Sequence, residues 1–313
     1  MNTNVAVNSL YYKLKPFVPR SLQIVLRRWL VKVKRKKNAD TWPILHSASR
    51  PPENWPGWPG QKRMAVVLTH DVESLQGTTK CRRLAELETR LGFKSSFNFV
   101  ARRYHVPDNL RDDLEKAGFE VGVHGVYHDG KLFESQKIFQ QRAAIINQAL
   151  KEWKAVGFRS PAMHHNLEWL HDLDISYDLS TFDTDPFEPQ SDGVATIFPF
   201  WVHHKATGNR YLEMPYTLVQ DFTLFILMKE RTTRIWREKL DWIFSQGGMV
   251  LLNAHPDYMA FDGEKRNIET YPVKLYLDFL EYLKSEYDGL YWHALPKEML
   301  QFCHDSSALV EAA

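Results

Sequence analysis

Short apolar runs of strand character alternate with helical patterns from residue 64 nearly to the C-terminus, and this alternation constrains the fold more than any other feature. The strand-like runs cover residues 64–69, 95–100, 120–123, 211–217, 249–254 and 290–295, with weaker ones at 156–159 and 177–182. The helical patterns cover residues 79–91, 108–117, 134–154, 230–246 and 272–286. Strands that alternate with helices predict a parallel α/β sheet or barrel, because each helix carries the chain back to the edge where the next strand begins.

The composition is that of an ordinary globular protein, with 44% hydrophobic and 25% charged residues among 313. Two cysteines, Cys81 and Cys303, are too few for a disulfide framework and favour a reducing compartment. The N-terminus lacks the pattern of a secretory signal, and the longest apolar run is too short to span a bilayer. We therefore expect a soluble, cytoplasmic protein.

Residues 1–39 form a basic arm with ten Lys or Arg and no acidic residue, whereas residues 40–313 hold 30 basic and 38 acidic residues. Apolar residues recur in the arm at helical spacing: Leu22, Val25, Leu26, Trp29 and Val33. This spacing predicts an amphipathic helix. Its apolar face suits an anionic membrane surface, and it suits equally a docking site on the body or on a second subunit. No nucleic acid is expected as a partner, because nothing else in the chain is typical of a nucleic-acid-binding module.

A change of composition marks the boundary between the arm and the body. Residues 40–63 hold five Pro, two Gly and three Trp, which predicts a linker without regular structure that packs through its tryptophans. We expect a catalytic domain over residues 64–303 and a C-terminal tail over 304–313.

Polar residues with chemical potential follow the ends of four expected strands. They are Asp71 and Glu73 after the first run, His124 and His128 after residues 120–123, Arg159 at the end of the run at 156–159, and His255 after residues 249–254. Because the carboxyl ends of parallel strands meet at one rim of a barrel, we expect these side chains to form one site.

His124 and His128 lie four residues apart, which places both on one face of a helical turn where they can hold a metal ion. A carboxylate from Asp71 or Glu73 would complete a His₂–carboxylate ligand set, since residues two apart in an extended segment face the same side. The other carboxylate can then remove a proton from the attacking water, and His255 can protonate the leaving group. This is the equipment of metal-assisted hydrolysis of an amide or ester.

Four motifs in order resemble those of the NodB-type polysaccharide deacetylases, carbohydrate esterase family 4. They read "THDVE" (69–73), "HGVYH" (124–128), "RSP" (159–161) and "LLNAH" (251–255). In that family the corresponding motifs are Thr-Phe-Asp-Asp-Gly, His-[Ser/Thr]-x-x-His, Arg-x-Pro and Leu-x-x-His. The resemblance covers about residues 64–300 and implies a distorted, incomplete (β/α) barrel of about seven strands, here with a basic N-terminal helical extension.

Carried over residue by residue, the resemblance implies that Asp71 is the general base, that His124 and His128 bind the metal, and that His255 is the general acid. Arg159 would hold the base carboxylate in position. The sequence "STFDTD" (180–185) lies near the family's fourth motif, whose aspartate supports the catalytic histidine. Asp183 is the preferred residue for this role, with Asp185 and Asp257 as alternatives.

Two positions depart from the family pattern. The usual metal-binding aspartate is replaced by Val72, so we infer that Glu73 takes the ligand role, as in Asp-Val-Asp/Glu variants of the superfamily. The Ser or Thr of the second motif is Gly125, which removes a hydroxyl that often braces the site.

The resemblance implies a divalent-metal enzyme, with Zn²⁺ the expected ion, that removes an acetyl group from a sugar of a bacterial surface polysaccharide or its precursor. A lipid-linked or nucleotide-linked precursor suits a cytoplasmic protein whose basic arm lies on the inner membrane. One alternative is an allantoinase-like hydrolase of cyclic amides from the same superfamily. Another is a non-catalytic carbohydrate-binding or scaffold protein, which Val72 leaves open. The joint presence of Asp71, Arg159 and His255 weighs against it, because binding alone requires neither an acid nor a base.

Overall fold

The computed structural model describes residues 19–306. The first 18 residues of the basic arm and residues 307–313 of the expected tail lie outside the described residues.

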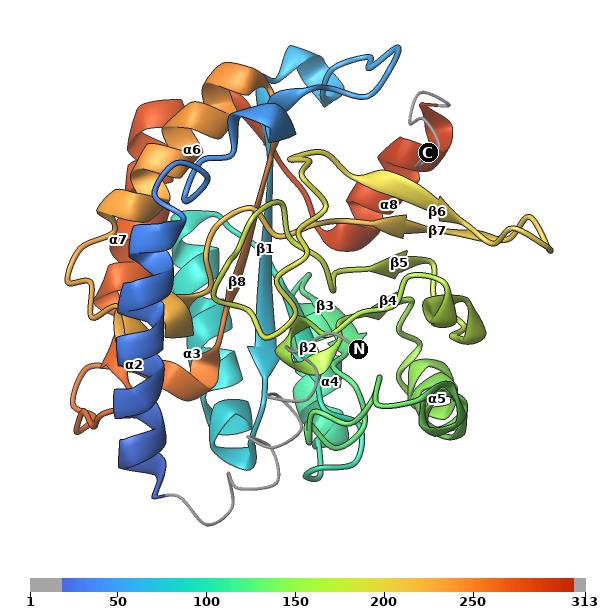
Figure 1. The fold of residues 1–313 in the computed structure, drawn as a ribbon, viewed down its shortest axis with the longest axis horizontal. Coiled ribbons are helices and arrows are strands. Elements are labelled where there is room, and N and C mark those ends of the chain that lie inside the picture. Colours follow the sequence, from blue (N-terminus) through green and yellow to red (C-terminus); the bar gives the residue numbers. More distant parts are fainter. Residues whose placement is uncertain (1–18, 307–313) are drawn as a thin grey trace.

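One curled sheet of nine strands forms the centre of the molecule (Figure 1). Its strands are β1 (Met64–Val72), β2 (Ser96–Phe99), β3 (Glu120–Val123), β4 (Gly157–Phe158), β5 (Tyr177–Asp178), β6 (Phe200–His203), β7 (Arg210–Glu213), β8 (Met249–Ala254) and β11 (Tyr291–His293). A separate two-stranded sheet joins β9 (Met259–Ala260) to β10 (Tyr271–Pro272).

Seven strands run parallel in the order β8-β1-β2-β3-β4-β5-β7. After β7 the chain makes two single bridges, from Tyr216 to Phe182 and from Leu218 to Leu252 in β8. These bridges bring the two ends of the parallel series together without forming a regular strand there. The expected distorted, incomplete barrel of about seven strands is confirmed. Outside this series, β11 pairs with the beginning of β1 and β6 pairs antiparallel with β7.

Helices cover the outside of the sheet, with α2, α3, α6 and α7 grouped on one side (Figure 1). The helices are α2 (Arg20–Lys37), α3 (Leu75–Leu91), α4 (Asp108–Lys116), α5 (Gln136–Trp153), α6 (Arg234–Gln246), α7 (Lys274–Tyr287) and α8 (Pro296–Asp305). Local sequence sets their ends: the Ser74 hydroxyl accepts a hydrogen bond from the Gly77 amide at the start of α3, and Gly92 ends that helix at a φ of 87°.

Several described elements were not expected from the sequence. They include β6, α8, the small sheet of β9 and β10, and a π-helical segment, Phe222–Leu227. Short 3₁₀ helices were also not expected, and two of them, His46–Ser49 and Pro59–Gln61, lie in the linker that was predicted to lack regular structure. Because α8 extends through Asp305, regular structure continues into the first residues of the expected tail.

The linker after α2 packs through its tryptophans, as expected. Trp42 and Trp58 are both buried, and the Trp58 indole donates to the Gly247 carbonyl at 2.8 Å. Trp55 packs edge-on against Trp58, with ring centroids 4.6 Å apart.

The basic helix α2 docks on the body along one side. Ile24 and Val31 are buried in this contact. The Lys34 ammonium donates to the Pro186 carbonyl at 2.7 Å, and the Arg28 guanidinium donates to the Ile226 carbonyl at 2.9 Å. Among residues 19–306, no helix has the length and apolar character needed to cross a membrane.

Candidate active site

The carboxyl ends of the parallel strands bring the candidate residues together. Asp71 and Glu73 stand at the end of β1, His124 directly after β3, Arg159 directly after β4, and His255 directly after β8. Because side chains alternate along a strand, Asp71 faces the opposite side of β1 from its neighbour His70. The rim expected from the sequence is therefore present.

Glu73, His124 and His128 form a cluster suited to a metal ion. One ligand atom from each of these residues lies within 4.8 Å of the others, and no other group of this kind occurs among residues 19–306. Two imidazoles and one carboxylate match a His₂–carboxylate set that leaves positions for water and substrate. The donor chemistry fits a divalent metal.

His124 is oriented so that one ring nitrogen faces this cluster. Its Nδ1 lies 3.1 Å from the Arg159 carbonyl oxygen, whereas its Nε2 is buried and has no hydrogen-bond partner. Burial lowers the pKa of His124 to about 4, against the opposing charge of Asp71. A neutral imidazole with one nitrogen bound to a carbonyl and an unpaired lone pair on the other is the usual state of a metal-binding histidine.

Glu73 is held from three directions. Its Oε1 lies 3.1 Å from His128 Nε2, its Oε2 accepts from the Tyr258 hydroxyl at 2.5 Å, and its main-chain amide donates to Asp257 at 2.9 Å. Burial alone raises the pKa of Glu73, but the His128 and His255 charges and the two side-chain hydrogen bonds outweigh burial and hold the pKa well below its usual range. The carboxylate is therefore ionised and fixed in place.

Asp71 lies in a separate network of hydrogen-bond donors. Its Oδ1 accepts from Asn98 at 3.0 Å and from Arg159 at 3.4 Å, and its Oδ2 accepts from Asn253 at 2.8 Å. Burial would raise the pKa of this carboxyl, but the charges of His124, Arg159 and His255 hold the pKa at about 2. Arg159 thus contacts Asp71 as the resemblance implies.

His255 is paired with Asp221, a residue that sequence reasoning missed. Its Nδ1 lies 2.6 Å from Asp221 Oδ1, and its Nε2 lies 3.8 Å from Glu73 Oε1. Asp221 also accepts from the Tyr271 hydroxyl at 2.9 Å. Burial lowers the pKa of His255, but the Asp221 carboxylate and, beyond it, Glu73 and Asp71 raise the pKa to about 10. The imidazolium form is therefore favoured, with one N–H directed at the site.

The expectation that Asp183 supports His255 is contradicted by these contacts. Both oxygens of Asp183 accept from the Lys239 ammonium, at 2.9 and 2.7 Å. The alternatives are occupied as well, because Asp185 accepts from Tyr216 and Asp257 accepts from the Glu73 amide and the Ser74 hydroxyl. Asp221 holds the position because Leu218 bridges to Leu252 of β8, three residues before His255.

The backbone explains the glycine in the second motif. Gly125 has a φ of 65°, and a Cβ at this position would lie 2.6 Å from the Pro161 ring. The serine or threonine of the family pattern is therefore excluded here by both conformation and space.

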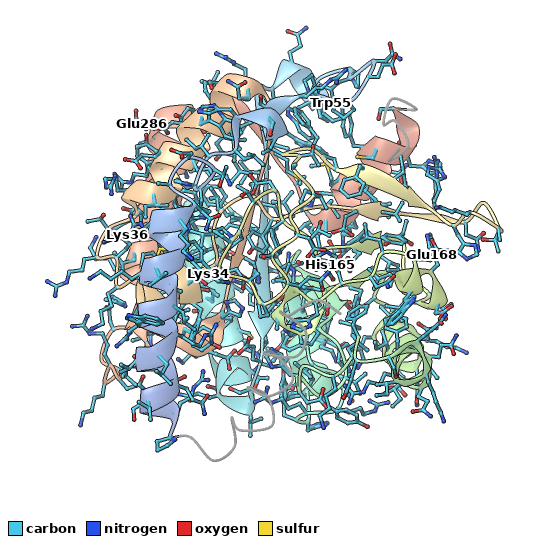
Figure 2. The ribbon with its side chains drawn as sticks, in the orientation of Figure 1. Lys34, Lys36, Trp55, His165, Glu168 and Glu286 are labelled. Atoms are coloured by element: carbon cyan, nitrogen blue, oxygen red, sulfur yellow. The ribbon has the colours of Figure 1, made fainter. Side chains whose placement is uncertain are left out.

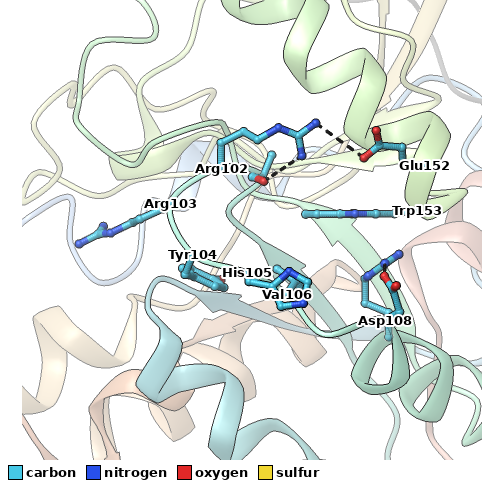
Figure 3. A pocket seen from close by; sticks show the side chains of 10 residues that line it. Arg102, Arg103, Tyr104, His105, Val106, Asp108, Glu152 and Trp153 are labelled. Atoms are coloured by element: carbon cyan, nitrogen blue, oxygen red, sulfur yellow. Dashed lines mark hydrogen bonds and ion pairs between the residues drawn. The ribbon is translucent and has the colours of Figure 1, made fainter.

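A pocket of about 570 Å³ lies beside the loop that carries the two histidines (Figure 3). The Arg102 amide donates to the Val126 carbonyl at 2.9 Å, which joins the pocket wall to that loop. The pocket residues include Arg102, Arg103, Tyr104, Arg111 and Trp153. Arg102 pairs with Glu152 and Arg111 pairs with Asp108 in this lining. Arg103 is left without a carboxylate partner there, so the pocket has one excess positive charge and is partly aromatic.

Solved structures share this architecture. A protein assigned as a polysaccharide deacetylase from Mycobacterium smegmatis superposes with a TM-score of 0.64 at 16% identity, over 84% of this chain and 97% of that one. A second such protein, from Pseudomonas aeruginosa PAO1, gives a TM-score of 0.60 at 15% identity, over 83% and 97% of the two chains. The chain has the polysaccharide deacetylase fold.

The same fold also occurs in Puue allantoinase, which gives a TM-score of 0.63 at 16% identity over 85% of this chain and 97% of the other. No protein-family model matches the chain, and no curated protein matches it in sequence. Because an allantoinase shares this fold, the fold alone does not distinguish deacetylation from cyclic-amide hydrolysis. The side chains at the rim are the evidence that bears on this choice.

Proposed function

We propose that the protein is a metal-dependent hydrolase that removes an acetyl group from a sugar, with Glu73, His124 and His128 as ligands of Zn²⁺. The observation that carries this proposal is the unpartnered, buried Nε2 of His124 beside the Glu73 carboxylate and His128. The departure at Val72 is compensated one residue later, because Glu73 and not Asp71 belongs to this cluster.

In the proposed hydrolysis, different side chains at the rim act as general base and general acid. A bound divalent metal supplies Lewis-acid polarisation of the acetyl carbonyl. Asp71, ionised and oriented by Asn98, Asn253 and Arg159, accepts the proton of the attacking water. His255, kept as imidazolium by Asp221, donates its Nε2 proton to the departing amine or hydroxyl of the sugar. A base and an acid thus both lie beside the ligand cluster, with Asp71 Oδ2 3.8 Å from His124 Nδ1 and His255 Nε2 3.8 Å from Glu73 Oε1.

The substrate we infer is an acetylated precursor of a bacterial surface polysaccharide, processed in the cytoplasm. The basic pocket supports a precursor that carries phosphate, as lipid-linked and nucleotide-linked sugars do, because arginine recognises phosphate with two N–H donors. The Trp153 and Tyr104 rings give it apolar surface for a sugar. Arg103→Gln is expected to raise KM for a phosphate-linked acetyl sugar about tenfold and to leave KM for a neutral acetyl sugar unchanged.

Metal content and acetate release together test the proposal. The purified protein is expected to hold about one zinc per chain, and His124→Ala is expected to lose both the metal and acetate release. His304→Ala serves as the matched control, since this exposed histidine lies at the end of α8. A metal-free wild type with undiminished turnover, or unchanged turnover in His124→Ala, would overturn the proposal.

Cyclic-amide hydrolysis is the second candidate, because Puue allantoinase superposes as well as the deacetylases do. Assaying allantoin and acetylated sugars side by side separates the two. Turnover of allantoin alone would favour the second candidate, and turnover of neither by a metal-loaded protein would favour a binding or scaffold role.

A further inference from the structure

The helix α2 has apolar residues on two sides. One side packs on the body, and the other leaves a large apolar surface exposed. Five of the ten exposed large hydrophobic residues in the described chain lie on this helix. Their exposed fractions are 48% for Leu22, 51% for Val25, 50% for Leu26, 62% for Trp29 and 48% for Leu30. A contiguous exposed patch of this kind marks an interaction site more often than a free surface.

Cations extend this apolar strip along the same side of the helix. Lys32, Lys36 and Lys37 are exposed and lie seven residues, or two turns, after Val25, Trp29 and Leu30 respectively. Figure 2 shows the contrast between Lys36, which points away from the molecule, and Lys34, which points toward the body. We call the exposed strip with these three lysines the outer face of α2.

The positive charge of α2 favours an anionic lipid surface over a second copy of the chain as the partner of this face. Residues 20–37 hold eight Lys or Arg and no acidic residue. A second copy would bring two such helices together, and the like charges would repel. An anionic lipid surface attracts the lysines while its acyl region accepts Leu, Val and Trp side chains.

We propose that the outer face of α2 binds an anionic lipid bilayer, with the helix lying in the plane of the membrane. The site expected to perform chemistry is close to this helix. The Arg27 guanidinium lies 4.9 Å from the centre of the Phe222 ring, Phe222 packs on Tyr258 with ring centroids 4.6 Å apart, and Tyr258 donates to Glu73. Two side chains therefore connect α2 to Glu73, and membrane binding brings the rim close to the lipid surface.

The membrane contact does not depend on the proposed reaction, so it is tested by vesicle flotation of the full chain. Wild type is expected to float with vesicles of phosphatidylcholine and phosphatidylglycerol, and to float far less with phosphatidylcholine alone. The double variant Leu26→Glu, Trp29→Glu is expected to reduce the partition coefficient at least about tenfold, because it removes two apolar side chains and adds two negative charges. Val156→Glu, Leu290→Glu is the matched control, since it makes the same change at two exposed apolar residues elsewhere.

A second pair of variants isolates the charge. Lys32→Gln, Lys36→Gln, Lys37→Gln is expected to weaken binding to anionic vesicles roughly 100-fold, because each lysine near such a surface contributes about fivefold. Lys116→Gln, Lys137→Gln, Lys151→Gln removes the same charge from exposed positions on α4 and α5 and is expected to change binding little.

Brominated acyl chains report the depth of the helix. They are expected to quench the fluorescence of wild type, and Trp29→Phe is expected to bind as well as wild type with much of that quenching lost. Failure of wild type to bind anionic vesicles would overturn the proposal, as would equal binding by the α2 variants and their controls. A dimer in solution that Trp29→Glu dissociates, without vesicle binding, would assign the face to a second copy. Acetate release from a soluble acetyl sugar, measured on the same variants and expected to be unchanged, keeps this result separate from that of the proposed function.

Discussion

Two buried histidine–carboxylate pairs lie on neighbouring strands, His70 with Glu88 and His255 with Asp221. In the first pair, Nε2 of His70 lies 2.8 Å from Glu88 and Nδ1 lies 3.0 Å from the Ala254 carbonyl. In the second, Nδ1 of His255 lies 2.6 Å from Asp221, and Nε2 faces Glu73 at 3.8 Å. Each carboxylate also accepts from a tyrosine hydroxyl, Tyr276 for Glu88 and Tyr271 for Asp221.

The difference between the pairs is the second ring nitrogen. Both nitrogens of His70 are bound within the protein, so its imidazole can only join β1 to α3 and β8. One nitrogen of His255 remains directed at the rim, where it can exchange a proton with another molecule. A buried histidine–carboxylate pair therefore takes part in catalysis only where the second ring nitrogen of its histidine faces the active site. The same substitution is for this reason expected to affect turnover in one pair and stability in the other.

The largest expected effect follows His255→Gln. Loss of the general acid is expected to lower acetate release about 1,000-fold. The fold is expected to survive, because Asp221 keeps the hydrogen bonds from the 255 amide and Tyr271. Turnover with saturating zinc, together with the melting temperature, measures this, and a loss of less than tenfold would contradict the role given to His255.

His70→Gln is the matched substitution in the structural pair. A glutamine cannot reach both Glu88 and the Ala254 carbonyl, so a buried polar group loses its partner, and the free energy of unfolding is expected to fall by about 3 kcal/mol. The turnover of the folded fraction is expected to stay within about threefold of wild type. Urea unfolding and active-site-normalised kinetics distinguish the two effects, and a selective loss of turnover would place His70 in the chemistry.

The smallest effect is a shift in titration after Asp221→Asn. Because Asp221 raises the pKa of His255 to about 10 in the metal-free protein, the variant is expected to titrate closer to 6.5, the ordinary value for histidine. A histidine whose pKa is raised on folding stabilises the protein fully below pH 6.5, and this stabilisation is lost as the pH rises through 10. NMR titration of the zinc-free protein measures the shift in the pKa of His255. The free energy of unfolding is expected to fall less between pH 7 and pH 10 in the variant than in the wild type. An unchanged His255 titration would separate Asp221 from the function of the pair.

The sequence predicted the strands of the rim well, because strands buried on both faces read as continuous apolar runs. The bounds of β3 and β8 were predicted to the residue, and the residues that follow them, His124 and His255, lie at the rim. Local spacing predicted the two histidines together with a carboxylate from Asp71 or Glu73, and the choice of Glu73 came from the family resemblance. The helical turn expected at residues 124–128 is absent, because Gly125 and His128 both have positive φ and the two histidines lie in a loop.

Asp221 was missed because no local pattern leads to it. It lies 34 residues before His255 in the chain, and the pairing of Thr217 and Leu218 with β8 brings the two together. Asp183 lies near the position of the family's fourth motif, which favoured it in the sequence, yet its carboxylate accepts hydrogen bonds from Lys239 of α6. Asn98 and Asn253 carry a weak signal, since each is a lone amide within a buried strand, and such a residue needs a specific partner.

Gly122 in β3 makes the alignment of Asp71 depend on a residue without a side chain. It pairs with Asn98 across the sheet, and a Cβ at residue 122 would lie 2.1 Å from Asn98 Oδ1. Even an alanine there would displace the amide that donates to Asp71. A natural variant with this change would keep every motif intact and still lose the orientation of its base, so a genome survey that counts motifs would record an inactive descendant as a working copy.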